Sequence, residues 1–389
     1  MNPPGDAVPM GPRPTGMTVR ADFLSEPAQM TDDRRSSAAD AIAPPAAGHT
    51  THRAQNALVL AIAAGFPLLF FALGWAFIHA NSQTSDEAIH LTAGYSYLLT
   101  HDFRLNREHP PFIKELAGLA VYLRYRLPFE PDPSLWAQAL RHSLAVLFIA
   151  RDFVYRSPVP EEHLLRVGRL PNLALGTALV ALVGWWAYRL WGRRAALVAL
   201  ALAALEPNLI AHSSLVTTDL GAALFTFLAV YLLWELGSRP SWWRLEGVGI
   251  ATGLALASKY SAVLVLALAA VVAAGHVAQG GSLSMPGRPR PGGGLIGRAR
   301  EAAWSLGLIA AVAGLTVAAC YFFRDLTGWW VGFGDVAFHQ EAGHVAFFLG
   351  SYSTTGWWSY FLVAFLIKTP LGSLFLIATS LALYRAGRP

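Results

Sequence analysis

Long runs of apolar residues, separated by short polar links, follow one another along the chain after residue 53. The first run, residues 57–78, holds no charged side chain and is long enough to cross the hydrocarbon core of a bilayer as a helix. Further runs lie at about 165–190, 195–211, 216–236, 247–258, 261–276, 302–323 and 357–383. The two runs that flank Lys259 are short and could form one broken hairpin. The pattern predicts an all-α integral membrane protein with about eight transmembrane helices.

Residues 1–53 have a different composition, rich in Pro, Ala, Gly and Ser, with almost no apolar periodicity. Such a segment cannot bury a core, so we expect a disordered tail. It is not a signal peptide, because the first apolar run begins too late. Residues 54–389 are expected to form one transmembrane domain.

Basic residues in the short links predict the orientation of this domain. With the tail in the cytoplasm, these links fall on the cytoplasmic side, which agrees with the positive-inside rule. Their arginines are Arg189, Arg193, Arg194, Arg239, Arg244, Arg288, Arg290, Arg298, Arg300, Arg385 and Arg388. The loops at about 79–164 and 324–356 then lie outside. We therefore expect a multi-pass protein of the cytoplasmic membrane with its N-terminus in the cytoplasm.

The outer loop 79–164 contains two stretches of helical periodicity. One follows Asp86–Glu87, and the other follows Pro110–Pro111, where proline suits the first turn of a helix. We expect two amphipathic helices that lie along the membrane surface.

Composition supports a membrane protein and narrows its partners. Hydrophobic residues make up 54% of the 389 positions and charged residues 14%, against about 25% charged in soluble domains. The net charge of +5 does not point to nucleic acid, because most basic residues lie in the links that set topology. The single cysteine, Cys320, excludes a disulfide framework. The sequence has no Walker-type phosphate loop, so an ATP-driven pump has no support.

Two polar clusters in the outer loop are candidates for chemistry, because ionisable residues are costly to keep near a membrane. Asp86 and Glu87 lie just past the first span, where adjacent carboxylates could act as a general base or bind a metal. The same stretch also resembles a helix start. Glu108 and His109, held by two prolines, could form a metal or phosphate site, or an ordinary capped turn.

Two more candidates lie at span ends. Asp219 opens the span 216–236, where the helix dipole favours a carboxylate, and it could also orient a cation. Lys259 could pair with Asp219, meet an anionic lipid phosphate, or snorkel to the interface.

The outer loop 324–356 contains His339, Glu341 and His344. Their spacing and order differ from the HExxH pattern of metalloproteases, which excludes that interpretation. One of these histidines could still serve as a metal ligand, although single histidines in aromatic loops more often form ordinary hydrogen bonds.

Several of these segments, taken in order, resemble GT-C membrane glycosyltransferases. They are residues 86–95, Glu108-His109-Pro110-Pro111, residues 215–219, Ser258-Lys259-Tyr260, and the stretch from Gly356-Trp357-Trp358 to Lys368-Thr369-Pro370. The similarity is to bacterial enzymes that use a phospholipid-carried sugar, similar to protein O-mannosyltransferases and the lipid A aminoarabinose transferase (families 39 and 83). It runs from about residue 57 to the C-terminus. No single motif decides it, but the order of the motifs and their spacing relative to the spans are fairly specific.

The resemblance implies a sugar donor on a polyprenyl phosphate and an active site that transfers this sugar on the outer face of the membrane. We expect an inverting displacement by an acceptor hydroxyl, and the acceptor could be a protein, a lipid or a glycan. In the family, the acidic residue of the first outer loop is the catalytic base, a role that falls on Asp86 with Glu87 beside it. Glu108 matches a metal or substrate ligand and His344 a second ligand position. One divalent metal is therefore an expected cofactor.

The resemblance also indicates which residues contact the phosphate of the sugar donor. Asp219 and Lys259 match positions that orient the base or this phosphate. His109 stands where some relatives have lysine, so a phosphate contact from His109 would depend on its protonation.

Two rival interpretations remain open. A lipid or solute transporter would also place charges in membrane helices, but transporters concentrate polar residues at broken helices near mid-membrane, often in repeated halves. Here the polar residues lie at outer span ends, and no internal repeat is evident. The other rival is an inactive homologue. Relatives are expected to continue with more membrane helices after the position that corresponds to Pro389. This chain is therefore expected to be either a short member of the family or a truncated one, and a truncated chain could be inactive.

Overall fold

The structure, a computed structural model, describes residues 47–287, 294–342, 345–385 and 387. Most of the predicted disordered tail, residues 1–46, therefore lies outside the described residues. The chain divides into two units, Met1–Thr51 and His52–Pro389, and the second unit holds every element that bears on function.

Helices dominate the described residues, as predicted. In chain order they are α1 (Ala47–Ala80), α2 (Glu87–Thr100), α3 (Phe112–Tyr125), α4 (Pro133–Gln138), α5 (Ser143–Tyr155), α6 (Glu161–Ala204), α7 (Pro207–Ser213), α8 (Asp219–Ser238), α9 (Trp242–Ser258), η1 (Tyr260–Val263), α10 (Leu264–Ala278), α11 (Leu295–Cys320), α12 (Gly328–Ala342), α13 (Tyr360–Lys368) and α14 (Leu371–Arg385). The only strands among the described residues, β1 (Ala346–Phe348) and β2 (Ser351–Ser353), form an antiparallel hairpin. The all-α fold class is confirmed, with this hairpin as a small addition.

Five helices within the described residues are long and apolar enough to cross a membrane: Val59–Ala80 of α1, α6, α8, Tyr260–Ala278 (η1 with α10) and α11. Helices α13 and α14 make a sixth if they count as one span, since they bend by 111° at the break between them. The predicted runs 195–211 and 247–258 do not add to this number. The first is merged into α6 and α7, and the second forms α9, which has 17 residues.

Helix α6 reverses direction at Gly192, whose φ of 80° and ψ of −167° are not helical. Gly184 and Leu200 lie sixteen positions apart, which a straight helix would separate by about 24 Å. Instead, a Cβ placed on Gly184 would lie 2.4 Å from a Leu200 methyl group. The two halves of α6 therefore pack as an antiparallel hairpin, called here the α6 hairpin.

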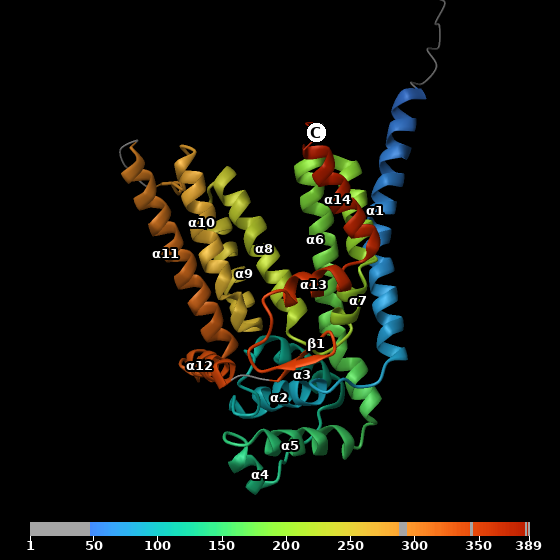
Figure 1. The fold of residues 1–389 in the computed structure, drawn as a ribbon, viewed down its shortest axis with the longest axis vertical. Helices are drawn as coiled ribbons and strands as arrows, with labels where there is room; N and C mark the ends of the chain where they lie inside the picture. The colour runs from blue at the N-terminus through green and yellow to red at the C-terminus, as the bar shows by residue number, and fades with distance from the viewer. Residues whose placement is uncertain (1–46, 288–293, 343–344, 386, 388–389) are drawn as a thin grey trace, which may run out of the picture. The chain divides into compact units, whose positions relative to one another are not determined.

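The elements that connect the long helices gather at two opposite ends of these helices (Figure 1). One, called here the loop end, carries α2, α3, α4, α5 and α12. The other, called here the basic end, carries the link at residues 189–194, the link at 239–244 and the first turns of α11. The predicted separation of basic links from the long polar loops is present in the fold.

The loop 79–164 contains four helices rather than the two predicted. The predicted pair corresponds to α2 and α3, while α4 and α5 lie in a stretch without a clear pattern. Helix α2 packs against α3, α5 and α6 and buries most of its residues, so it is enclosed by protein and not exposed along one face.

Helices α2 and α3 cross with their backbones in contact. A Cβ on Gly94 would lie 1.7 Å from the Lys114 carbonyl oxygen, and one on Gly118 would lie 2.4 Å from the Gly94 carbonyl carbon. Any side chain at either position would force the helices apart. This close crossing fixes the start of α3 against α2 and so positions the two clusters predicted to carry chemistry.

Candidate active site

Glu87 lies at the start of α2 and is completely buried. Its carboxylate accepts two hydrogen bonds from Arg169 of α6, at 2.8 Å from Nε and 2.6 Å from Nη2. It also accepts from the backbone N–H groups of Thr84 and Val216, each at 2.9 Å. Burial alone raises the pKa of Glu87, but these hydrogen bonds and the charge of Arg169 outweigh it and hold the pKa below its usual value. Glu87 is therefore an ionised carboxylate committed to protein partners.

Arg169 completes this buried pair from the other side. It is 1% exposed and also donates to the carbonyl oxygens of Ile78, Asn81 and Ser82, at 3.3, 2.9 and 2.9 Å. The guanidinium thus uses all of its donor directions, which offsets the cost of burying a charge. The pair ties the end of α1, the start of α2, α6 and the segment before α8 together.

Asp86 occupies the position before Glu87 and has a different environment. It is exposed, and its side chain makes no hydrogen bond that caps α2. Its carboxylate accepts a hydrogen bond from the Ser85 hydroxyl, at 3.4 Å. Asp86 thus presents an accessible carboxylate, while Glu87 holds the backbone beneath it in place.

His90 lies one helical turn after Asp86 and is 5% exposed. Its Nδ1 lies 2.8 Å from the carbonyl oxygen of Val216. A carbonyl only accepts, so Nδ1 carries the proton and Nε2 keeps its lone pair. Burial, with the nearby charge of Lys114, lowers the pKa of His90 and keeps the ring neutral. His90 had no assigned role in the sequence, although its i, i+4 spacing from Asp86 puts both on one helix face.

His109 packs edge-on against His90, with ring centroids 5.3 Å apart. Burial, with the nearby His90 ring and the charges of Lys114 and Lys259, lowers the pKa of His109 to about 3. The ring is therefore neutral at pH 7 and supplies no positive charge. Its Nδ1 is buried, and no hydrogen-bond partner for it exists among the described residues. A buried polar atom without a partner is costly and suggests that a ligand group meets it.

Lys114 holds the turn that presents Glu108 and His109. Its ammonium is 1% exposed and donates to the backbone oxygens of Asn106 and His109, at 2.6 and 2.7 Å. It also donates to the Asn106 side chain, at 3.1 Å. Burial lowers the pKa of Lys114 to about 7. Glu108 is exposed on this turn.

Asp219 and Lys259 form an ion pair between the start of α8 and the break before η1. Both side chains stay partly open to solvent, Lys259 at 34% and Asp219 at 46%. The pairing expected as one alternative for Lys259 is confirmed. The hydroxyls of Thr217 and Thr218, just before Asp219, are buried and find no partner in the described part of the chain.

Electrostatic coupling shows that these groups share one region. The charges of Asp86 and Asp219 both act on His90, and those of Lys259 and Asp219 act on His109. The structure thus brings together Asp86, His109, Asp219 and Lys259 at the loop end. Glu87 lies beneath them, in the buried pair.

The described residues do not form a metal site around the predicted ligand Glu108. No group of three or more His, Cys, Asp or Glu that could hold a metal occurs among them. His344 lies outside the described residues, so its proximity to Glu108 has no structural description.

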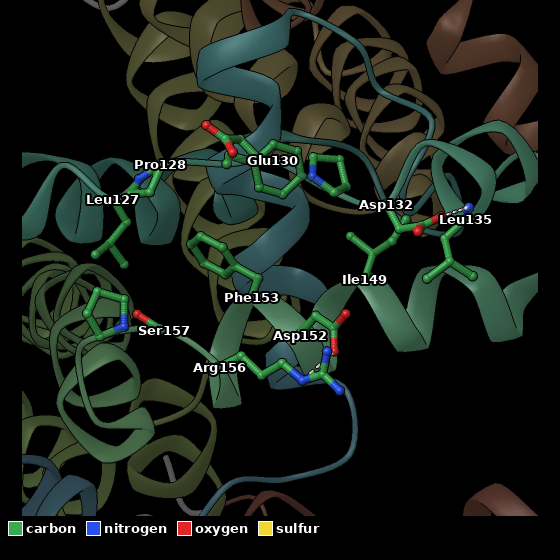
Figure 2. Close-up of a pocket in the computed structure, with 13 residues that line it drawn as sticks. Leu127, Pro128, Glu130, Asp132, Leu135, Ile149, Asp152, Phe153, Arg156 and Ser157 are labelled. Atoms are coloured by element: carbon green, nitrogen blue, oxygen red, sulfur yellow. Dashed lines mark hydrogen bonds and ion pairs between the residues drawn. The ribbon is translucent and has the colours of Figure 1, made fainter.

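A separate cavity of about 310 Å³ lies between residues 127–135 and α5 (Figure 2). Phe129 and Phe153 contribute its aromatic wall, and Glu130, Asp152 and Arg156 its charges. Asp152 pairs with Arg156 at 3.4 Å. None of the predicted site residues lines this cavity.

Fold and site together define a class: a multi-pass helical membrane protein with an accessible carboxylate, neutral histidines and an ion pair at one end of its spans. The family model of dolichyl-phosphate-mannose-protein mannosyltransferase matches residues 64–281, more than half of the chain, so the chain belongs to this family. The chain is accordingly a glycosyltransferase of a family that uses a polyprenyl-phosphate-linked sugar. No curated protein matches the chain.

The family match confirms the expected resemblance to protein O-mannosyltransferases. The bacterial subtype and the similarity to the lipid A aminoarabinose transferase stay predictions. The matched region includes Asp86, Glu108, His109, Asp219 and Lys259 and ends before His344.

Proposed function

We propose that the protein transfers a sugar from a polyprenyl-phosphate donor to an acceptor hydroxyl, with Asp86 as the general base. The observation that carries this proposal is the contrast between two adjacent carboxylates. Glu87 is fully buried and bound on both oxygens, whereas Asp86 is exposed and lacks a strong partner. A base must reach the acceptor proton, and only Asp86 of this pair is accessible.

The reaction is a single displacement with inversion at the anomeric carbon. The acceptor oxygen forms a bond to this carbon while its proton passes to the Asp86 carboxylate. The bond from the anomeric carbon to the phosphate oxygen breaks, and polyprenyl phosphate leaves with the electron pair. Glu87 acts as a positioning residue, because it fixes the start of α2 through Arg169.

The leaving phosphate needs a positive charge, and Lys259 supplies it. Lys259 is partly exposed, and Asp219 holds its ammonium at the start of α8. Charged groups fixed in this way stabilise charge that develops in the transition state. His109, being neutral, contributes its unpaired ring nitrogen as a hydrogen-bond partner for the sugar or phosphate.

The divalent metal expected at Glu108 and His344 stays a prediction. Glu108 is exposed and able to accept a ligand, but the described residues do not assemble three ligands around it. No step above depends on the metal.

Substrate and location follow the family and the charge distribution. The family description names a mannosyl donor and a protein acceptor, which favours mannose and a protein hydroxyl over a lipid or glycan acceptor. Arginines at the basic end favour a cytoplasmic location for that end. This orientation puts the active site on the outer face of the cytoplasmic membrane.

The test uses purified protein in detergent, synthetic polyprenyl-phosphate sugars with a labelled sugar, and acceptor peptides rich in serine and threonine. We expect label in the peptide, with the anomeric configuration opposite to that of the donor, as read by NMR of the product. A parallel sample with a chelator reports metal dependence. A retained configuration would contradict the single displacement. A second assay uses the protein reconstituted in proteoliposomes. Movement of the labelled sugar across their membrane, without any glycosylated product, would support the transporter alternative.

A further inference from the structure

A large apolar groove lies between α1 and the α6 hairpin, and none of the candidate active-site residues lines it. Its volume is about 510 Å³. Its lining is mostly aliphatic: α1 contributes residues from Val59 to Pro67, and the α6 hairpin contributes Ala181, Gly184, Ala196, Leu197 and Leu200. Both walls belong to spans, so the groove opens at the depth of the membrane.

The groove exists because α1 contacts the bundle through only part of its length. Toward the loop end, Phe70 and Ile78 are buried in a cluster with Leu173 of α6. Gly74 allows this contact, since a Cβ there would lie 2.4 Å from a Leu173 methyl group. Residues between Val59 and Pro67, which precede Phe70 in α1, line the groove. An apolar space between two spans is not left empty in a bilayer.

The mouth of the groove carries the chemistry of a phospholipid headgroup region. Trp185 and Tyr188 line it and are 49% and 44% exposed, as expected for aromatic side chains at a membrane interface. Arg193 also lines it, with exposed Arg194 next in the chain. The groove therefore runs from an aliphatic interior to an aromatic and basic mouth at the basic end.

We propose that this groove binds an anionic phospholipid of the leaflet at the basic end. One acyl chain fills the space between α1 and the α6 hairpin, and the phosphate lies against Arg193 and Arg194. Juxtamembrane arginines attract anionic lipids in this way. The bound lipid completes the contact between α1 and the bundle, and α1 leads directly into the segment that carries Asp86.

The site is distinct from the one for the sugar donor. The donor phosphate belongs at the loop end beside Lys259, whereas the groove opens at the basic end. The test of the groove lipid therefore does not require sugar transfer, and its failure is distinguishable from a failure of the proposed function.

The test measures lipid retention and thermal stability of delipidated protein. Phosphatidylglycerol or phosphatidylcholine is added back in mixed micelles. Native mass spectrometry counts the lipids retained, and a thiol-reactive fluorophore follows unfolding through Cys320, the single and buried cysteine. We expect phosphatidylglycerol to be retained preferentially and to raise the unfolding temperature more than phosphatidylcholine does.

Three variants locate the effect. In Arg193→Gln/Arg194→Gln, phosphatidylglycerol retention is expected to fall roughly fivefold per arginine removed. Ala64→Trp fills the groove, so phosphatidylglycerol is expected no longer to raise the unfolding temperature of this variant. The variant is expected to stay folded without lipid. Arg300→Gln, an exposed arginine on α11 at the same end, serves as the matched control and is expected to retain wild-type binding.

Three outcomes overturn the proposal. The first is equal retention of the two lipids by wild type. The second is retention of phosphatidylglycerol by the double arginine variant equal to that of wild type. The third is a wild-type dimer that Ala64→Trp dissociates, which would show that a second copy of the chain occupies the groove.

Discussion

At the residue scale, the site depends on which carboxylates are committed to the protein and which are free. Asp86 and Glu87 are adjacent in sequence, and only the family resemblance favours Asp86 over Glu87 as the base. Burial separates them, because Glu87 accepts from Arg169 while Asp86 faces solvent. Arg169 lies 82 positions from Glu87. No local pattern could have predicted that partner.

Other residues show where sequence reasoning succeeds and fails at this scale. The pairing of Asp219 with Lys259 could be anticipated, since both lie at span ends predicted on the same side. Burial of Lys114 and Glu115 could not, because a Lys-Glu pair on a predicted amphipathic helix suggests its polar face. The structure encloses both, at 1% and 8% exposure. The close crossing of α2 and α3 is the physical reason.

Glu115 makes a pH-dependent prediction. Burial raises its pKa to about 8 from 4.5, so the folded protein binds this proton more tightly than the unfolded chain does. The stability that Glu115 contributes is therefore fully present below pH 4.5 and is lost as pH rises toward about 8. We expect Glu115→Gln to unfold at a higher temperature than wild type near pH 9, and at the same temperature near pH 4. Thermal unfolding of both proteins across this range measures the difference. A gap that is constant with pH would show that Glu115 is not buried as described.

At the element scale, periodicity predicts the long spans well. The runs at 57–78, 216–236, 261–276 and 302–323 match α1, α8, α10 and α11, because a lipid-facing helix needs a continuous apolar stretch. The helices α4, α5 and α12 were not predicted. They are short or carry mixed polarity, and their packing partners are distant in sequence.

The contact between α2 and α3 yields a second prediction. Gly118→Ala places a Cβ 2.4 Å from the Gly94 backbone, which the helices cannot relieve by a side-chain rotation. We expect a loss of roughly 3 kcal/mol in stability, seen as a lower unfolding temperature and a lower yield of folded protein. Gly65→Ala in α1 is the control, because no atom lies within 4 Å of its Cβ, and it is expected to match or slightly exceed wild type. Equal stability of Gly118→Ala and wild type would show that the crossing is looser.

At the scale of the whole molecule, the two ends of the spans differ in charge and in chemistry. The sequence predicted this separation from the position of arginines in short links. The reversal of α6 at Gly192 agrees with it, because the two halves of the α6 hairpin run in opposite directions and the second half leads the chain back toward the loop end. Family membership makes the chain a glycosyltransferase, and its candidate site lies at the loop end of the spans.

Orientation in the membrane gives the third prediction. Arg151→Cys puts a thiol on exposed α5 at the loop end, and Arg300→Cys puts one at the basic end. We expect a membrane-impermeant thiol reagent added to intact cells to label the first variant and not the second until the cells are opened. Cys320 is buried and keeps the background low. Labelling of Arg300→Cys alone in intact cells would reverse the proposed orientation.

The central claim is that Asp86 removes the proton from the acceptor hydroxyl. The measurement that tests it most directly is the rate of sugar transfer by Asp86→Asn, compared with wild type and with Glu130→Gln, an exposed carboxylate of the same loop outside the site. Because Asp86 makes no capping hydrogen bond, the variant is expected to fold normally and to lose transfer by roughly 10²–10⁴-fold, while Glu130→Gln keeps the wild-type rate. A folded Asp86→Asn protein that transfers sugar at the wild-type rate would contradict the account.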